Sequence, residues 1–187
     1  IDEELLGYTQ ALGIWPLRER IADHYKENYD VTIEPAQVVI TTGSSAGFIL
    51  SFLATLDAGD VVAIPRPGYP CYREILKLLD LQSVELPLDF ENGFLPTIEA
   101  VTEAVEQKGA KALLLASPSN PTGRMISGER LNQICDYTTK KGVWFFSDEI
   151  YHGLSYDAEA TTVAGAGEQV IVLNSFSKYY SMTGWRI

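Results

Sequence analysis

Short apolar runs alternate along the chain with longer segments in which apolar residues recur every three or four positions. The short runs are rich in β-branched and aliphatic residues, which is typical of buried strands. The expected strands are 38–41, 61–64, 83–86, 112–116, 143–147 and 170–174. The longer segments have the period of amphipathic helices. The expected helices are 16–29, 45–56, 70–79, 97–107 and a helix capped by Ser127 that reaches Lys141.

This alternation predicts an α/β fold with a mainly parallel sheet that helices cover on both faces. In such sheets, ligands bind at the carboxyl ends of the strands. Side chains that can bind a ligand or react follow several of the predicted strands directly, and we therefore expect them to share one site. They are Ser44, Ser45, Tyr69, Asn120, Asp148 and the segment 175–178.

Lys178 lies in the segment Ser-Phe-Ser-Lys, eight residues before Arg186. A lysine amine can hold an aldehyde cofactor covalently as a Schiff base. The hydroxyls of Ser175 and Ser177 can bind the cofactor's phosphate, and an arginine can bind two of its oxygens at once. A lysine after a strand is more often simply solvated, so this interpretation needs support from the rest of the chain.

The turn 43–47, with the sequence Gly-Ser-Ser-Ala-Gly, opens the helix expected over 45–56. The free N–H groups and the dipole at a helix start favour a phosphate. The alternative is a turn of small residues in which a serine caps the helix.

Asp148 follows a run of apolar residues, and a carboxylate at a buried strand end needs a partner. A protonated pyridine nitrogen can be that partner, and the aspartate then keeps the ring cationic and able to withdraw electrons from a carbanion. The alternative is an aspartate that caps the next helix.

Tyr151 and Asn120 can both hydrogen-bond the 3-oxygen of such a ring, and Tyr69 can stack on its face. Each also has a plain structural explanation: the tyrosines as core residues, and Asn120 as part of the turn Asn-Pro-Thr-Gly. His24 and His152 have no serine or cysteine nearby in a nucleophile setting, and we expect structural or surface roles for both.

The formal net charge of −11 argues against nucleic acid or an anionic membrane surface as a partner. It does not exclude a small anionic ligand, which responds to the local field. Cys71 and Cys135 lack metal-type spacing, so we expect no metal site and a reduced, cytoplasmic setting. We find no signal peptide, and no apolar run approaches the roughly 20 residues of a membrane span.

Three segments together resemble the class I/II aminotransferases, the fold type I enzymes that depend on pyridoxal 5'-phosphate. They are 119–123, 148–151, and Ser175-x-x-Lys178 with 182–186, in the family's order and spacing. The matching segments run from Tyr8 to Arg186. The resemblance implies a three-layer α/β/α domain with a mainly parallel mixed sheet, and an enzyme that transfers amino groups between an amino acid and a 2-oxo acid.

The same resemblance implies a role for each candidate residue. Lys178 would form the Schiff base and carry the proton, Asp148 would face the pyridine nitrogen, and Tyr151 would complete the catalytic set. Tyr8 would reach the phosphate of a neighbouring subunit, which implies a homodimer. The implied cofactor-binding set is Ser44, Ser45, Ala46, Tyr69, Asn120, Asp148, Tyr151, Ser175, Ser177, Lys178, Arg186 and Tyr8.

The resemblance also implies that the chain is incomplete, because the family enzymes are about twice as long. We interpret residues 1–187 as a truncated large cofactor-binding domain without the smaller C-terminal domain. In the family, the strand begun by residues 184–187 lies between the first strand and the strand that ends at Asn174. A sheet without it exposes unpaired backbone groups, and we expect an unusual association that hides them.

Two alternatives to an aminotransferase stay open on sequence grounds. The first is a carbon–sulfur β-lyase or related synthase of the same fold, which shares most of these residues. The second is a non-enzymatic regulator with an aminotransferase-like domain. No helix-turn-helix or basic arm is visible in the 187 residues.

Overall fold

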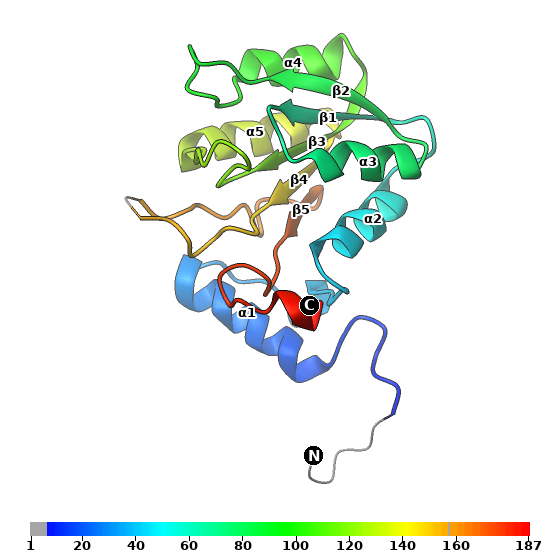
Figure 1. The fold of residues 1–187 in the computed structure, drawn as a ribbon, viewed down its shortest axis with the longest axis vertical. Coiled ribbons are helices and arrows are strands. Elements are labelled where there is room, and N and C mark those ends of the chain that lie inside the picture. The colour runs from blue at the N-terminus through cyan, green and yellow to red at the C-terminus, as the bar shows by residue number, and fades with distance from the viewer. Residues whose placement is uncertain (1–6, 157) are drawn as a thin grey trace. The chain divides into compact units, whose positions relative to one another are not determined.

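The computed structural model describes residues 7–156 and 158–187 (Figure 1). Its contacts divide the chain into two compact units, 1–41 and 42–187, and each is described here by itself. Unit 42–187 contains the sheet and nearly all of the candidate residues. Within the described residues, no helix is long and apolar enough to cross a membrane.

The described part of unit 1–41 contains helix α1 (Trp15–Tyr29) and a short 3-10 turn at Pro35–Gln37, so the predicted helix is confirmed. The strand predicted over 38–41 is wrong, because the segment is irregular. A run of apolar residues becomes a strand only when a neighbour supplies a hydrogen-bonded ladder. Here the N–H of Ile40 donates to the carbonyl of Leu12 at 3.0 Å instead.

Unit 42–187 is built on a five-stranded sheet in the order β2-β1-β3-β4-β5, in which every pair is parallel. The predicted α/β fold with a mainly parallel sheet is therefore confirmed. The strands are β1 (Val61–Arg66), β2 (Gln82–Pro87), β3 (Ala110–Ala116), β4 (Trp144–Asp148) and β5 (Val170–Leu173). The helices are α2 (Ser44–Thr55), α3 (Pro70–Leu78), α4 (Ile98–Glu106) and α5 (Gly128–Lys141), with a 3-10 turn at Thr183–Trp185.

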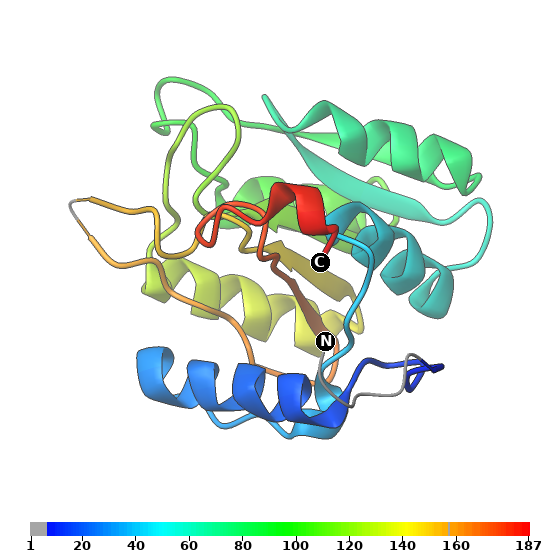
Figure 2. The same cartoon turned by 60° about the horizontal axis from the view of Figure 1, so that its bottom comes forward.

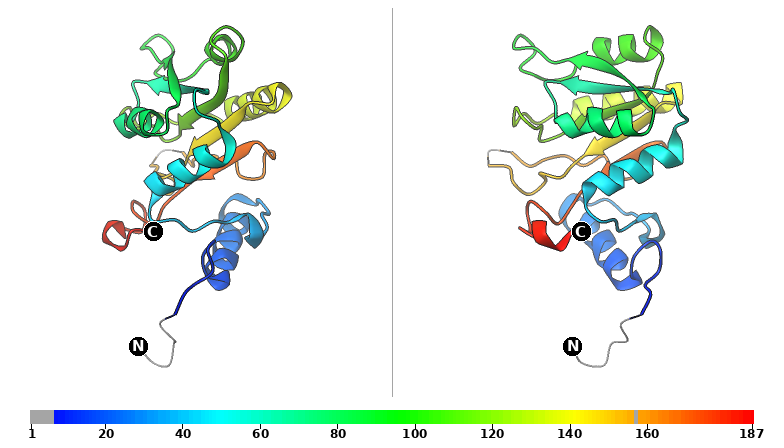
Figure 3. Two further views of the ribbon diagram at one scale, coloured as in Figure 1. Left: turned by 90° about the vertical axis from the view of Figure 1, so that its right-hand side faces the viewer. Right: turned by 45° about the vertical axis from the view of Figure 1, so that its right-hand side comes forward.

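The two faces of the sheet carry separate apolar clusters, which makes the unit three layers deep (Figure 1; Figure 3). Neighbouring residues of a strand point to opposite faces. Phe145 therefore packs with α4 and α5, whereas Phe146 packs with α2 and α3. Both phenylalanines are fully buried, and this double burial is why strand β4 reads as a continuous apolar run.

The helices that follow β1 and β3 lie on opposite faces of the sheet, α3 on one and α5 on the other. β1 and β3 are neighbours, so the chain reverses its direction of winding between them. Such a switch point opens a crevice at the carboxyl ends of the strands. Tyr69 follows β1 and Asn120 follows β3, so both come directly after the carboxyl ends of the strands at this switch point.

Candidate active site

The register of the parallel strands aligns the carboxyl ends of β3, β4 and β5. Asp148, the last residue of β4, lies opposite Ala116 of β3 on one side and Leu173 of β5 on the other. The loops that begin at Ser117 and Asn174 therefore leave the sheet beside Asp148. This alignment explains how residues about 30 positions apart along the chain come together.

Lys178 lies in the loop that follows β5, with its amine 5.8 Å from the centre of the Tyr151 ring. Two backbone hydrogen bonds close a turn around it: the N–H of Ser181 donates to the carbonyl of Lys178 at 3.0 Å, and that of Met182 donates to the carbonyl of Phe176 at 3.1 Å. Lys178 is exposed, and it forms no ion pair with the described residues. Its amine therefore remains available for chemistry.

Tyr151 links this lysine to the loop after β3. The amide nitrogen of Asn120 donates to the Tyr151 hydroxyl at 3.5 Å, a long hydrogen bond. The structure thus brings together Lys178, Tyr151 and Asn120, which sequence analysis placed around one ring.

Tyr69, the residue before α3, lies at the same place and is 39% exposed. A hydrogen bond to Cys71 and burial raise the pKa of its hydroxyl, and the neighbouring ionisable side chains of Cys71, Tyr151 and Asp148 raise it further. An exposed aromatic ring next to Tyr151 and Asp148 is a surface on which a flat heterocycle can stack.

The carboxylate of Asp148 is buried, and sequence analysis missed its main partner. The hydroxyl of Tyr72 donates to Oδ2 at 2.5 Å, and the N–H of Ile150 donates to Oδ1 at 3.1 Å. Burial raises the pKa of Asp148, while these two hydrogen bonds lower it. Tyr72 escaped notice because it falls on the apolar face of α3 with Ile75, a position that reads as ordinary core.

A second region of the site pairs a helix start with a guanidinium. Gly43 precedes α2 with a φ of +85°, and a Cβ added to it would lie 2.6 Å from Nη2 of Arg186. Figure 2 shows the segment 174–187, in red, beside the start of α2. Arg186 donates from Nη1 to the carbonyl of Thr183 at 2.8 Å and forms no ion pair with the described residues.

The small residues predicted to bind a phosphate border this same region. Ser44 and Ser45 begin α2, while the N–H of Ala46 donates to the carbonyl of Gly43 at 3.1 Å. The Ser175 hydroxyl lies 2.9 Å from that of Ser177 and 3.0 Å from the carbonyl of Ile187.

A buried pair, Glu149 and His152, supports the turn that carries Tyr151. Glu149 accepts hydrogen bonds from Thr162 and from the N–H of Val163, at 2.7 and 3.0 Å. Its Oε2 lies 3.5 Å from Nδ1 of His152, whose Nε2 is 3.0 Å from the carbonyl of Ser117. Because a carbonyl only accepts, Nε2 carries the proton that binds Ser117.

Burial affects the two members of this pair in opposite directions, because it disfavours both charged forms. It raises the pKa of Glu149 to about 7 and lowers that of His152 to about 4. The pair ties the turn after β4 to the end of β3. It therefore fixes Tyr151 relative to the loop that carries Asn120.

Tyr8 is the one candidate that lies outside unit 42–187. It belongs to unit 1–41, where its side chain is fully exposed. Among the described residues, no group of His, Cys, Asp and Glu is arranged to hold a metal ion.

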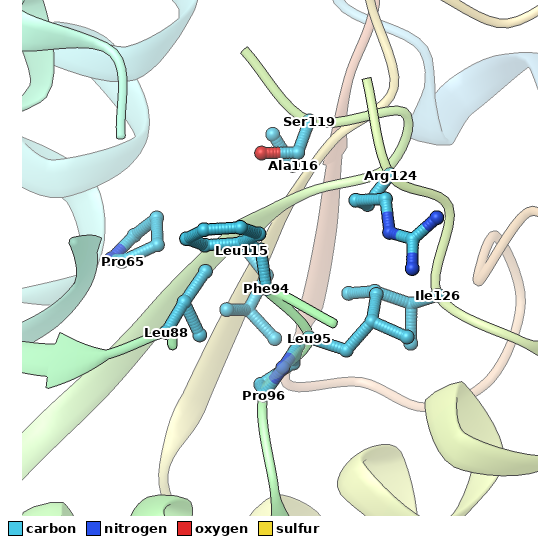
Figure 4. A pocket seen from close by; sticks show the side chains of 10 residues that line it. All are labelled: Pro65, Leu88, Phe94, Leu95, Pro96, Leu115, Ala116, Ser119, Arg124 and Ile126. Carbon is cyan, nitrogen blue, oxygen red and sulfur yellow. The ribbon is translucent and has the colours of Figure 1, made fainter. Parts of the chain in front are cut away.

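A small apolar pocket is lined by Ser119, the neighbour of Asn120, but by none of the candidate site residues (Figure 4). Its empty space of about 240 Å³ includes open solvent and lies between the ends of β1 and β3 and the loop before α4. Its two polar lining residues are Ser119 and Arg124, and Arg124 already donates to the carbonyl of Gly93 at 2.8 Å. The pocket is smaller than most ligand sites, and we assign it no function.

Comparison with known proteins gives a consistent result. The family profile for aminotransferase class I and II matches residues 1–187. The chain belongs to the aminotransferase class I and II family. The resemblance noted from the three sequence segments is therefore confirmed, and members of this family are enzymes.

Individual relatives agree with this family assignment. A valine–pyruvate aminotransferase of Mycobacterium tuberculosis is 47% identical over 184 residues, which are 97% of this chain and 47% of that protein. A crystal structure of an aminotransferase from the same organism has a TM-score of 0.90, covering 97% of this chain and 50% of that one. An aromatic aminotransferase from Pyrococcus horikoshii, 31% identical, also superposes with a TM-score of 0.90 over 96% of this chain and 49% of its own.

The chain spans about half the length of the relatives it matches. The names of these relatives also differ in the substrate they state. An enzyme of Methanocaldococcus jannaschii named (5-formylfuran-3-yl)methyl phosphate transaminase is 38% identical over the whole chain. High similarity in this half of the protein therefore accompanies different substrates.

Proposed function

We propose that the protein containing this chain is a pyridoxal 5'-phosphate-dependent aminotransferase that acts through Lys178. The observation that carries the proposal is the convergence of Lys178 and Asn120 on Tyr151, next to the buried carboxylate of Asp148. When bound, the cofactor supplies an aldehyde that condenses with an amine and an electron-poor ring that stabilises a carbanion. The family assignment supports amino transfer over lyase or regulatory activity.

Each residue has a defined task in this proposal. The amine of Lys178 holds the cofactor covalently. When this amine is free of the cofactor, it takes up the proton from the substrate α-carbon. The carboxylate of Asp148 faces the ring nitrogen and keeps it protonated, and Tyr151 and Asn120 hydrogen-bond the 3-oxygen. Tyr69 provides the stacking surface. Arg186, Ser175, Ser177 and the start of α2, at Ser44, Ser45 and Ala46, bind the phosphate.

The arrangement around Arg186 fits a phosphate. A helix start and a guanidinium are both positive and lie close together at Gly43, so both would stabilise an anion that binds there. Among the described residues, no carboxylate forms an ion pair with Arg186. A phosphate would satisfy both groups, and the arginine can bind it through two oxygens.

The lysine assignment has a direct test. The protein is incubated with pyridoxal 5'-phosphate, reduced with borohydride, digested and analysed by mass spectrometry. We expect the reduced adduct on Lys178 and its complete loss in Lys178→Ala, with full labelling in the control Lys140→Ala, which removes an exposed helix lysine. An adduct on another residue in the wild type would refute the assignment.

The reaction type is tested with the protein that contains this chain. We expect conversion of 2-oxoglutarate or pyruvate to the corresponding amino acid when an amino-acid donor is supplied. Release of ammonia and pyruvate from a cysteine conjugate, without amino transfer, would favour the β-lyase. Cofactor binding with neither activity would favour the regulator.

The proposal extends to assembly. We propose a cytoplasmic homodimer in which Tyr8 reaches the phosphate of the neighbouring subunit, as the family resemblance implies. The fully exposed Tyr8 side chain is compatible with a contact to another subunit. Sedimentation of the protein that contains this chain should give a dimer, and Tyr8→Phe should weaken cofactor binding; a monomer with full cofactor affinity would refute this part.

A further inference from the structure

Tyr72 and Asp148 form a buried contact that packing alone does not require. Their side chains come from α3 and from the end of β4, and the two residues are 2% and 5% exposed. The Tyr72 ring packs among apolar neighbours, including Phe48 at 5.3 Å between ring centres. A phenylalanine would fill that space equally well, so the hydroxyl needs a separate explanation.

The hydrogen bond between the two side chains has a defined donor and acceptor. An ionised carboxylate only accepts hydrogen bonds, so Tyr72 donates its proton to Oδ2 of Asp148. Burial and the adjacent carboxylate both raise the pKa of Tyr72, which keeps this proton in place. The hydrogen bond from Ile150 occupies Oδ1. Each carboxylate oxygen has a second lone pair, so Asp148 can still accept from a ligand.

We propose that Tyr72 is a positioning residue that keeps the Asp148 carboxylate charged and aimed at the ring nitrogen of the bound cofactor. The proposal rests on the function proposed above. A buried carboxylate tends to take up a proton and become neutral, and a neutral carboxyl group holds a protonated pyridine poorly. The hydrogen bond from Tyr72 opposes this tendency without introducing a positive charge that would repel the ring.

Other titratable groups near this pair do not replace the hydroxyl. The phenols of Tyr69 and Tyr151 lie close enough to raise the pKa of Tyr72, but neither has a hydrogen bond to Asp148 among those of the described residues. Glu149, the next residue, is held by Thr162, Val163 and Ser147. Tyr72 is thus the side-chain donor on which the charge of Asp148 depends.

The test compares Tyr72→Phe with Tyr137→Phe. The control removes the same hydroxyl from a tyrosine that donates to an exposed carboxylate, Glu106, at 3.3 Å. We expect the cofactor dissociation constant of Y72F to rise about tenfold, on the scale of one hydrogen bond to a charged group, while that of Y137F stays within about twofold. In an Asp148→Asn background, Y72F should add less than about twofold, because no carboxylate charge remains to be held.

A second readout needs no cofactor. The carboxyl carbon of Asp148 in the apoprotein is followed by NMR as pH changes, with assignment from D148N. The midpoint should lie about one pH unit higher in Y72F than in the wild type, equivalent to the tenfold change in binding. The bound cofactor's absorbance should also lose its protonated-ring form at lower pH in Y72F.

The outcomes separate this inference from the proposed function. If the wild type takes up no cofactor, the proposed function fails and the role towards the ring fails with it, while the NMR midpoint still decides whether Tyr72 holds the charge. If the wild type binds cofactor and Y72F matches Y137F in affinity and midpoint, the inference is overturned and the function stands. An equal effect of Y72F with and without Asp148 would assign Tyr72 a packing role and also overturn it.

Discussion

The pKa values of Glu149 and His152 are shifted in opposite directions, so the two residues should affect the pH dependence of folding stability in opposite ways. Glu149 titrates near 7 in the fold instead of 4.5, so its contribution to stability is present below pH 4.5 and is lost as pH rises to about 7. His152 titrates near 4 instead of 6.5, so its contribution rises as pH increases from about 4 to 6.5. In the wild type the two trends oppose each other between about pH 4.5 and 6.5.

Single substitutions should expose each trend. The Glu149→Gln variant loses the contribution that falls with pH and keeps the His152 contribution that rises. The free energy of unfolding of this variant, relative to wild type, should therefore increase between pH 5 and 6.5. His152→Gln keeps Glu149 and should show the reverse. Each slope is about 1 kcal/mol per pH unit and the two have opposite signs, so the gap between the two variants should widen by about 2 kcal/mol per pH unit, as measured by urea denaturation at several pH values. Parallel pH profiles would show that the pair does not ionise in this way.

Gly153 offers a test of the Lys178 loop. Its φ is +86°, and an added Cβ would lie 2.6 Å from the ring of Tyr179, the residue after the lysine. Gly109 is the matched control, with a φ of +69° and open space around it. Gly109→Ala should cost about 1 kcal/mol from backbone strain alone. Gly153→Ala should cost more and should also reduce borohydride trapping on Lys178; equal stability and equal trapping in the two variants would contradict this contact.

Helix α5 shows how a local signal fixes one element. Ser127 precedes the helix, and its hydroxyl accepts from the N–H of Arg130 at 3.3 Å. Ser127→Ala should lower the free energy of unfolding by about 1 kcal/mol, and Ser127→Asp, which can still cap, should recover most of it. Thermal or urea denaturation measures both variants. An aspartate variant as unstable as the alanine variant would show that the cap is not the cause.

Periodicity predicted the helices and the central strands of unit 42–187 because their burial is regular. It failed at 38–41, where the same kind of apolar run forms no ladder. It also ended the first strand of the sheet too early, at Ile64, although β1 continues through Pro65 to Arg66. Proline lacks an N–H, and it is tolerated there because β3 pairs only with residues 61–63 of β1.

The two edges of the sheet differ across the molecule. The edge strand β2 carries Glu85, which forms ion pairs with Arg66 and Arg73, and such charges discourage pairing with other chains. The opposite edge strand, β5, has the sequence Val-Ile-Val-Leu and no charge. Among the described residues of unit 42–187, β5 pairs only with β4.

We therefore expect the isolated chain of 187 residues to associate through β5. Light scattering over a concentration series should show an increase in mass. The association should be weaker for the protein that contains this chain if further residues cover that edge. A monomer at every concentration would contradict the expectation.

The order of residues along the chain was enough to predict the layered α/β unit and the family, and it singled out Lys178 as the candidate Schiff-base lysine. Those features depend on local periodicity and on short segments that keep their meaning wherever they lie. The hydrogen bonds from Tyr72 to Asp148, from Thr162 to Glu149 and between His152 and Ser117 could not be predicted in this way. Each joins residues from separate segments of the chain, and an apolar position such as Tyr72 reveals its polar contact only when packing brings the other group to it.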